Sequence, residues 1–259
     1  MQQEFVHLHL HSEFSLSDGI IRIDDLVKKS SDLSFSAVAL TDLTNLFGLI
    51  KFYRLARKQG IKPIVGSEIK VAKDLDSQPG SLVMLVKNKI GYTNLTKLVS
   101  KAYVEGQVSG EPIVKLSWLE EYSEGLIALS GGIDGHIGQS ILGGNDALTN
   151  SRVDYFHKLF KGDFFIEIQR LGKNNETEYN QKVIDLAMQK KIPLVATNDV
   201  RFLMPVDPDI SPSDFEAHEA RVCIQKGQAL DDPRRSKDYV ENQYLRSPEE
   251  MNELFTDLP

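Results

Sequence analysis

The sequence predicts an α/β fold in which strands and helices alternate and the strands close, or nearly close, into a barrel. Short apolar runs typical of buried strands recur through the first 200 residues, and most are separated by helical segments. Such alternation builds βαβ units with parallel strands inside and helices outside. Polar residues suited to chemistry follow several of these runs, and in barrels such residues gather at the carboxyl ends of the strands.

The apolar runs define the expected strands, which cover residues 5–10, 36–40, 62–71, 81–86, 126–129, 164–168 and 193–197. Amphipathic stretches predict helices over residues 24–29, 46–58, 91–102, 176–190 and 215–225. Gly66 interrupts the third apolar run, so this run is expected to form either one bent strand or a strand pair. Ser247, Pro248 and Glu250 match a capping box with proline at the first helical position, which predicts a further helix.

The residue composition of the chain changes after Phe202. Three prolines and three aspartates between residues 205 and 214 predict a loop, and a helix and a charged turn follow it. We therefore expect residues 1–203 to form the barrel core. Residues 204–259 are expected to form the remainder of the domain and the start of a connection to a further region.

Composition places the chain among ordinary globular proteins. A formal net charge of −7 argues against a surface built chiefly to bind nucleic-acid backbone. The single cysteine, Cys223, excludes an internal disulfide and favours a cytoplasmic location. No apolar run reaches the length needed to span a membrane, so we expect no membrane partner.

A histidine-rich motif ends the first predicted strand. His7, His9 and His11 alternate with apolar residues, so the three imidazoles are expected on one face of the strand. Imidazole is the commonest ligand of divalent metals, and Asp18 in the following loop could add a carboxylate. The alternative is that the histidines only cap the strand end through hydrogen bonds.

Other chemistry-bearing residues also fall at predicted strand ends, which favours one shared pocket. The full set consists of His9, His11, Thr41, Asp42, Glu68, Gly131, Gly132 and Asp199.

Seven stretches, in this order, resemble the polymerase-and-histidinol-phosphatase (PHP) domain at the N-terminus of the bacterial replicative DNA polymerase III alpha subunit. They are HLHLHSEFSLSDG (7–19), ALTDLTNLFGLIKFY (39–53), GIKPIVGSEI (60–69), LVKNKIGYTNLTKLVSKAY (85–103), GLIALSGG (125–132), VATNDVRFL (195–203) and AHEARVCIQKG (217–227). The resemblance implies a distorted seven-stranded (β/α) barrel, the PHP fold, within a longer DNA-directed DNA polymerase. The nucleotidyltransferase residues of that parent are expected beyond Pro259, so this segment alone should not polymerise DNA.

The resemblance also implies which residues occupy the metal-ligand positions of the family. Members with a working site hold two or three ions, and five of their ligand positions are kept here: His9, His11, Asp18, Glu68 and Asp199. Four are replaced, by Leu43, Ser81, Gly132 and Arg201, none of which is a metal ligand of the family's type. We expect the Arg201 guanidinium to lie where a metal would have been, on Asp199 and on Glu68 or Asp18. The alternative is that Arg201 points at solvent.

Two functions from different classes follow. The first is a scaffold with a vestigial metal site, no catalytic residue and no cofactor, which docks the separate proofreading 3′–5′ exonuclease subunit and steadies the rest of the alpha subunit. The second is a metal-dependent phosphoesterase, either an intrinsic 3′–5′ exonuclease or a pyrophosphatase. It would use a single divalent ion (Zn, Mn or Mg) at low occupancy on His9, His11 and one of Glu68 or Asp199.

Direct contact with DNA is a third possibility, and it fits the net negative charge of the chain poorly. Lys87, Lys89, Lys97 and Lys101 could form a modest basic strip, but a solvated helix face is the favoured explanation of these lysines. We therefore expect little or no direct DNA binding by this segment.

Overall fold

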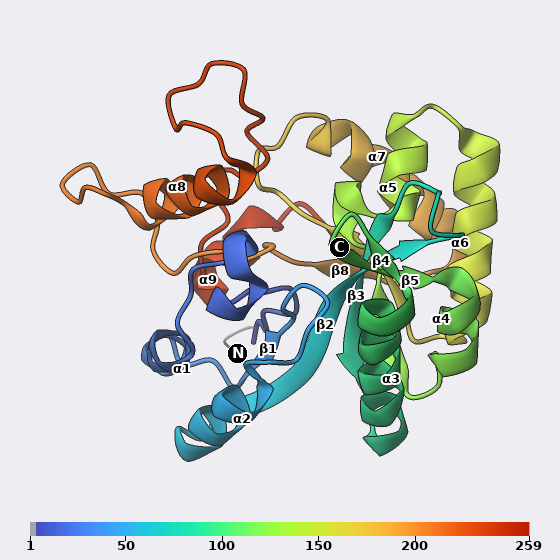
Figure 1. Ribbon diagram of the computed structural model, residues 1–259, viewed down its shortest axis with the longest axis horizontal. Helices are drawn as coiled ribbons and strands as arrows, with labels where there is room; N and C mark the ends of the chain where they lie inside the picture. Colours follow the sequence, from blue (N-terminus) through green and yellow to red (C-terminus); the bar gives the residue numbers. More distant parts are fainter. Residues whose placement is uncertain (1–3, 259) are drawn as a thin grey trace.

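A computed structural model describes residues 4–258 as a twisted sheet flanked by helices on both sides (Figure 1). The strands are β1 (Ala37–Leu40), β2 (Lys62–Ala72), β3 (Gly80–Val86), β4 (Gln107–Val108), β5 (Glu111–Lys115), β6 (Leu126–Leu129), β7 (Phe164–Ile168) and β8 (Leu194–Ala196). The helices are α1 (Ile23–Asp32), α2 (Leu49–Lys58), α3 (Lys89–Glu105), α4 (Leu116–Tyr122), α5 (His136–Leu142), α6 (Asp146–Phe160), α7 (Glu176–Lys190), α8 (Asp214–Lys226) and α9 (Pro248–Leu254). The predicted α/β class is confirmed.

The sheet is mixed, and this corrects the prediction of parallel pairing throughout. Strand β2 pairs in parallel with β1 along its first half and with β5 along its last three residues. Strand β3 is antiparallel to both β2 and β6, whereas β6, β7 and β8 are parallel. The connection from β2 to β3 spans only residues 73–79, which is too short for the crossover that a parallel neighbour needs.

An extended N-terminal segment, residues 7–11, lies between the two edges of this sheet and joins them. On one side, Ala39 N–H donates to the carbonyl of His7, and Thr41 N–H donates to the carbonyl of Leu10, both at 2.9 Å. On the other side, the backbone of residues 9–11 exchanges hydrogen bonds of 2.9 and 3.1 Å with Val200. The segment forms one isolated bridge rather than the regular strand expected over residues 5–10. Together with β1, β2, β3, β6, β7 and β8, it completes a ring of seven extended segments, as the family resemblance implies.

Three apolar clusters hold the ring and its helices together, and the smallest consists of Ala39, Val83, Leu85 and Leu129 on the strands. The largest joins β2, β3, β6 and β7 to α3, α5, α6 and α7. The second joins Leu10 of the closing segment to α1, β1, α2 and Leu245 near the C-terminus. The closing segment is therefore packed by both ends of the chain, and it carries the histidine motif.

The sequence prediction named only the strand at 126–129 between residues 103 and 160, and the structure adds β4, β5, α4, α5 and α6 there. The α6 signal was present, because its buried residues Thr149, Val153, Phe156 and Phe160 recur at helical spacing. The short α4 and α5 span too few turns to show such a period. Among the described residues, no helix is both long and apolar enough to cross a membrane.

His7 is buried at the closure and makes the fold sensitive to acid. Its Nε2–H donates to the carbonyl of Arg246 at 2.9 Å, and its ring packs edge-on against Phe5 and Phe35. Burial lowers the pKa of His7 from 6.5 to about 4, so the folded protein keeps the ring neutral where the unfolded chain protonates it.

We predict that the stability difference between wild type and His7→Gln shrinks by about 3 kcal/mol between pH 7 and pH 4. The unfolded state binds the extra proton below pH 6.5, so wild type loses this stability as the pH falls, whereas the variant has no such proton to bind. Urea unfolding at each pH measures it, with exposed His157→Gln as the control. A difference that stays constant with pH contradicts the assignment.

Candidate metal centre

The predicted site residues converge at one end of the ring. His9 and His11 come from the closing segment, Glu68 from β2, and Asp199 and Arg201 from the chain just after β8. Asp18 ends the 3₁₀ turn Glu13–Asp18. A cavity of about 570 Å³ opens over the cluster, and Asp18, Glu68, Lys70, Lys173, Asp199, Arg201 and Tyr239 are among its lining residues.

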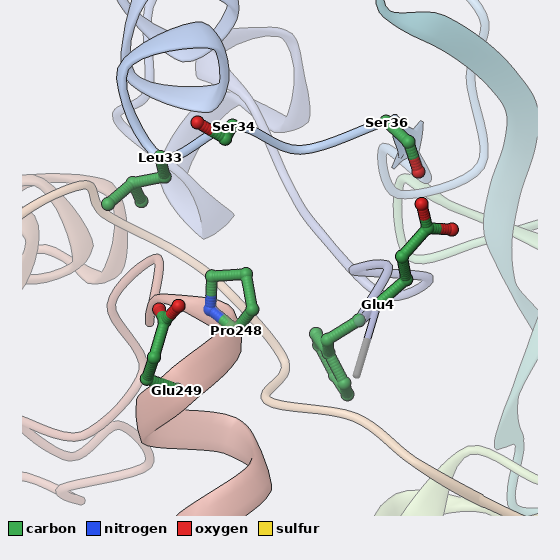
Figure 2. Close-up of a pocket in the computed structure, with 7 residues that line it drawn as sticks. Glu4, Leu33, Ser34, Ser36, Pro248 and Glu249 are labelled. Carbon is green, nitrogen blue, oxygen red and sulfur yellow. The ribbon is translucent and has the colours of Figure 1, made fainter. Parts of the chain in front are cut away.

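A separate pocket of about 170 Å³ lies where β1 begins, between the turn before that strand and the start of α9 (Figure 2). Its lining, which includes Glu4, Ser34, Ser36 and Pro248, holds none of the predicted site residues.

The strand-end set does not all share this site, which corrects the sequence expectation. Asp42 instead anchors the loop that carries Asp18. Its carboxylate accepts from Ser12 N–H at 2.7 Å, from the Ser12 hydroxyl, and from the Ser15 hydroxyl at 2.6 Å. His7 also lies apart, on the carbonyl of Arg246.

Arg201 is the centre of the cluster and is only 5% exposed. Its guanidinium donates to Asp199 Oδ1 from Nε at 2.8 Å and from Nη2 at 2.5 Å. Nη1 donates to the Asp18 carboxylate and to His11 Nδ1, the latter at 2.8 Å, and Nη2 lies 3.5 Å from Glu68 Oε2. The predicted ion pairs of Arg201 are present, and the alternative of a solvent-facing arginine is wrong.

The two imidazoles face Glu68 from the opposite side. His9 Nε2 lies 3.2 Å and His11 Nε2 lies 2.9 Å from Glu68 Oε2. His11 accepts from Arg201 through Nδ1, and its buried Nε2 has no aligned hydrogen-bond partner among the described residues. One ligand atom from each of His9, His11 and Glu68 lies within 4.8 Å of the others.

Charges in the cluster lower the pKa values of Asp18, Glu68 and Asp199 and so favour their ionised forms. Burial alone would raise the pKa values of Asp18 and Asp199, but the Arg201 guanidinium holds both well below their usual range. Burial likewise opposes ionisation of Glu68, and Lys70 with the two imidazoles outweighs it, so its pKa is also lowered. Burial would lower the pKa of His9, but its carboxylate neighbours raise it well above 6.5.

Glu167 of β7 is one of the site residues that the sequence reasoning missed. It is fully buried and accepts from His9 Nδ1 at 2.7 Å, from Gly131 N–H at 3.1 Å, and from the Thr197 hydroxyl. This contact fixes the ring of His9, as carboxylates commonly do for ligating histidines. The available signal was a charged residue within the apolar run 164–168.

Residues from the C-terminal segment complete the cluster, and the sequence gave no sign of them. Gln243 donates to Asp199 Oδ2 at 2.7 Å, and the Tyr239 hydroxyl donates to Asp18. Lys173 Nζ lies 3.6 Å from the same oxygen of Asp199. Residues 237–243 therefore lie against the site and are tied to it through its carboxylates.

Comparison with known proteins places this arrangement in a family. The family model of the PHP domain matches residues 7–171. This chain belongs to the PHP domain family.

The chain is also similar over its full length to two curated polymerase subunits. It is 46% identical over 260 residues to DNA polymerase III subunit alpha of Pseudomonas aeruginosa. It is 46% identical over 259 residues to the subunit of the same name from Escherichia coli (strain K12). Each alignment covers all of this PHP chain but only 22% of the relative, so the chain spans about a fifth of their length.

One solved structure shares the fold of this PHP domain. It is a candidate metal-dependent phosphoesterase from Bifidobacterium adolescentis, with a TM-score of 0.52 and 12% sequence identity. The superposition covers 76% of this chain and 87% of that one. At this identity the likeness concerns the fold alone.

The positions that the sequence analysis predicts to be replaced ligand positions make other contacts. The Ser81 hydroxyl donates to Glu68 Oε1 at 2.5 Å and accepts from Lys70 Nζ at 2.6 Å. Gly132 has φ +58°, and a β-carbon there would lie 3.0 Å from the side-chain oxygen of Gln169. Leu43 forms an isolated bridge with Glu68 through its backbone. Protein groups thus stand at or beside several places where the family pattern has ligands.

The donor set fits one ion at most and does not fit a cluster of two or three. One ligand atom from each of His9, His11 and Glu68 has the spacing of a three-ligand site, although His11 Nε2 already lies 2.9 Å from Glu68 Oε2. Arg201 already neutralises Asp18 and Asp199, and its charge lies 3.5 Å from Glu68 Oε2, where it opposes a cation.

We predict that Arg201→Ala lowers the free energy of unfolding by about 3–5 kcal/mol, because it leaves buried carboxylates without their counter-charge. Urea unfolding followed by circular dichroism measures it. Arg234→Ala, whose side chain is 87% exposed, is the matched control and should change little. Equal stability of the Arg201 variant and wild type would show that the network contributes nothing.

Proposed function

We propose that this chain is the PHP portion of a bacterial replicative DNA polymerase III alpha subunit and acts in the cytoplasm as a non-catalytic scaffold. The observation that carries the proposal is the buried Arg201 guanidinium on Asp18 and Asp199. A cation fixed to the protein leaves no room for the multi-ion cluster that hydrolysis in this family uses. The similarity to polymerase subunits over the whole chain supports the parent that we assign.

The scaffold role follows from what Arg201 connects. Asp18 belongs to the N-terminal loop, Glu68 to β2 and Asp199 to the chain after β8. Tyr239 adds the C-terminal segment through its bond to Asp18 and through its ring, which lies 5.7 Å from the guanidinium carbon. One side chain therefore joins four separate parts of the sequence, a task that metal ions perform in family members with a working site.

We further propose that the domain docks the proofreading 3′–5′ exonuclease subunit. A stripe of exposed apolar side chains, Phe47, Ile50, Tyr53, Tyr103 and Val104, supports this partner surface; each is 41–81% exposed. The first three recur at helical spacing at and before α2, and the Phe47 ring lies 6.5 Å from that of Tyr103 in α3. We call this set the α2–α3 stripe.

The charges around the α2–α3 stripe indicate what kind of partner surface would suit it. Arg54 and Arg57 follow Ile50 and Tyr53 by one helical turn, and among the described residues neither has an ion-pair partner. A group of exposed apolar side chains with nearby unpaired cations suits a partner surface that is apolar with an acidic border.

The second candidate function is a metal-dependent phosphoesterase with a reduced site. The spacing of His9, His11 and Glu68 favours it, because three ligands with an open position are the minimum for metal-assisted hydrolysis. This alternative requires at least one bound divalent ion and therefore depends on the metal content of the protein.

We predict that Ile50→Ser/Tyr53→Ser weakens binding of the exonuclease subunit from the same organism at least 10-fold, because two apolar anchors of the stripe are lost. Titration by surface plasmon resonance measures it on the 259-residue chain. The matched control is Met188→Ser/Ile224→Ser, which removes apolar groups that are at least as exposed from α7 and α8. No binding by wild type contradicts docking, and equal weakening by the control contradicts the assigned surface.

A further inference from the structure

A second cavity of about 470 Å³ lies outside the metal centre. Its lining comes from the loop after β2, from the starts of α4 and α5, and from α6. Its lining is Lys73, Ser77, Gln78, Leu116, His136, Leu148, Ser151, Arg152, Tyr155 and Phe156. We call it the Arg152 pocket. It shares no lining residue with the cavity over Arg201, and its volume is within the range of small-molecule sites.

The Arg152 pocket is positively charged. Lys73 and Arg152 line it, and its lining contains no aspartate or glutamate. Lys73 is exposed and Arg152 is half-buried, and among residues 4–258 no carboxylate is within ion-pair distance of either cation. Arg152 makes one hydrogen bond, from Nη1 to the carbonyl of His136, so the rest of its donor fork is available.

His136 offers an acceptor beside this cation. Its Nε2–H donates to the carbonyl of Val71 at 2.7 Å, which fixes the tautomer and leaves a lone pair on Nδ1. Burial, and then the charge of Arg152, lower the pKa of His136, so the ring stays neutral. The pocket therefore combines donors for an anion with one acceptor for a hydroxyl or amino group.

One part of the lining is an apolar wall, and most of it comes from α6. Leu116 and Leu148 lie there with Tyr155 and Phe156. The Tyr155 hydroxyl donates to Glu120 at 2.9 Å, and its ring packs edge-on against Phe156 with centroids 5.2 Å apart. Such a wall suits the flat apolar face of an aromatic ligand, which stacks on side chains of this kind.

We propose that the Arg152 pocket binds a single nucleoside monophosphate. The phosphate lies on Arg152 and Lys73, where a planar guanidinium can make two parallel hydrogen bonds to it. The hydroxyls of Ser77 and Ser151 are further donors in the lining. The base lies against Leu148 and Tyr155, and His136 Nδ1 accepts from an amino or hydroxyl group of the ligand.

The test uses isothermal titration calorimetry of the full 259-residue chain with three probes: dAMP, deoxyadenosine and inorganic phosphate. We expect saturable binding of dAMP to one site, at least 10-fold tighter than binding of either part alone. Arg152→Gln should weaken dAMP at least 10-fold, and Lys73→Gln, in an exposed loop, should weaken it 3-fold or more without changing the melting temperature.

The matched control is Lys158→Gln, an exposed cation on α6 that does not line the pocket. Binding that is unchanged in both Arg152→Gln and Lys73→Gln, or equally weakened in Lys158→Gln, overturns the assignment. So does the absence of binding at 10 mM dAMP, or affinity for deoxyadenosine equal to that for dAMP. Tighter binding of a trinucleotide than of dAMP contradicts a pocket sized for one nucleotide.

Discussion

The rest of the structure depends on the contact between the Arg201 guanidinium and the carboxylates of Asp18 and Asp199. The ring of strands is closed by an N-terminal segment that forms only one isolated bridge to Val200. Backbone pairing at this seam is therefore limited, and the ion pairs beside it join the same pieces of chain through side chains. The loop that presents Asp18 is itself held in place by Asp42, so the guanidinium meets a preformed partner.

Charge balance explains why this centre can exist without a metal ion. Four carboxylates gather there, and four cationic groups face them: Asp18, Glu68, Glu167 and Asp199 against Arg201, Lys70, Lys173 and the protonated His9. Buried charges are tolerated only when they are paired and hydrogen-bonded. Each cation supplied by the protein reduces the attraction that the site offers to a divalent ion, and His9 must release a proton before it can act as a ligand.

The sequence could predict only those parts of this centre whose residues belong to a recognisable local pattern. The strand periods, the ligand-like residues at strand ends and the substitution at Arg201 are all readable in the chain, and they led to the α/β ring and to the Arg201 ion pairs. Glu167 and Lys70 were not found, because a charged residue on a strand reads as solvent-facing until its neighbours are known. Tyr239 and Gln243 reach Asp18 and Asp199 from more than 40 residues away, and no local pattern encodes that approach.

The antiparallel orientation of β3 was also not predicted. Strand orientation depends on the length of the connection between two strands. The seven-residue loop between β2 and β3 is too short for a parallel pair, but the general alternation of strands and helices favoured parallel pairing.

The most direct test of the central claim, that protein cations stand in for metal ions, is elemental mass spectrometry of the purified chain. The protein would be prepared without chelator or affinity nickel, beside a His9→Ala/His11→Ala control. The account predicts no stoichiometric zinc, manganese or iron in either protein. About one ion per chain in wild type, lost in the control, would contradict it and favour the phosphoesterase.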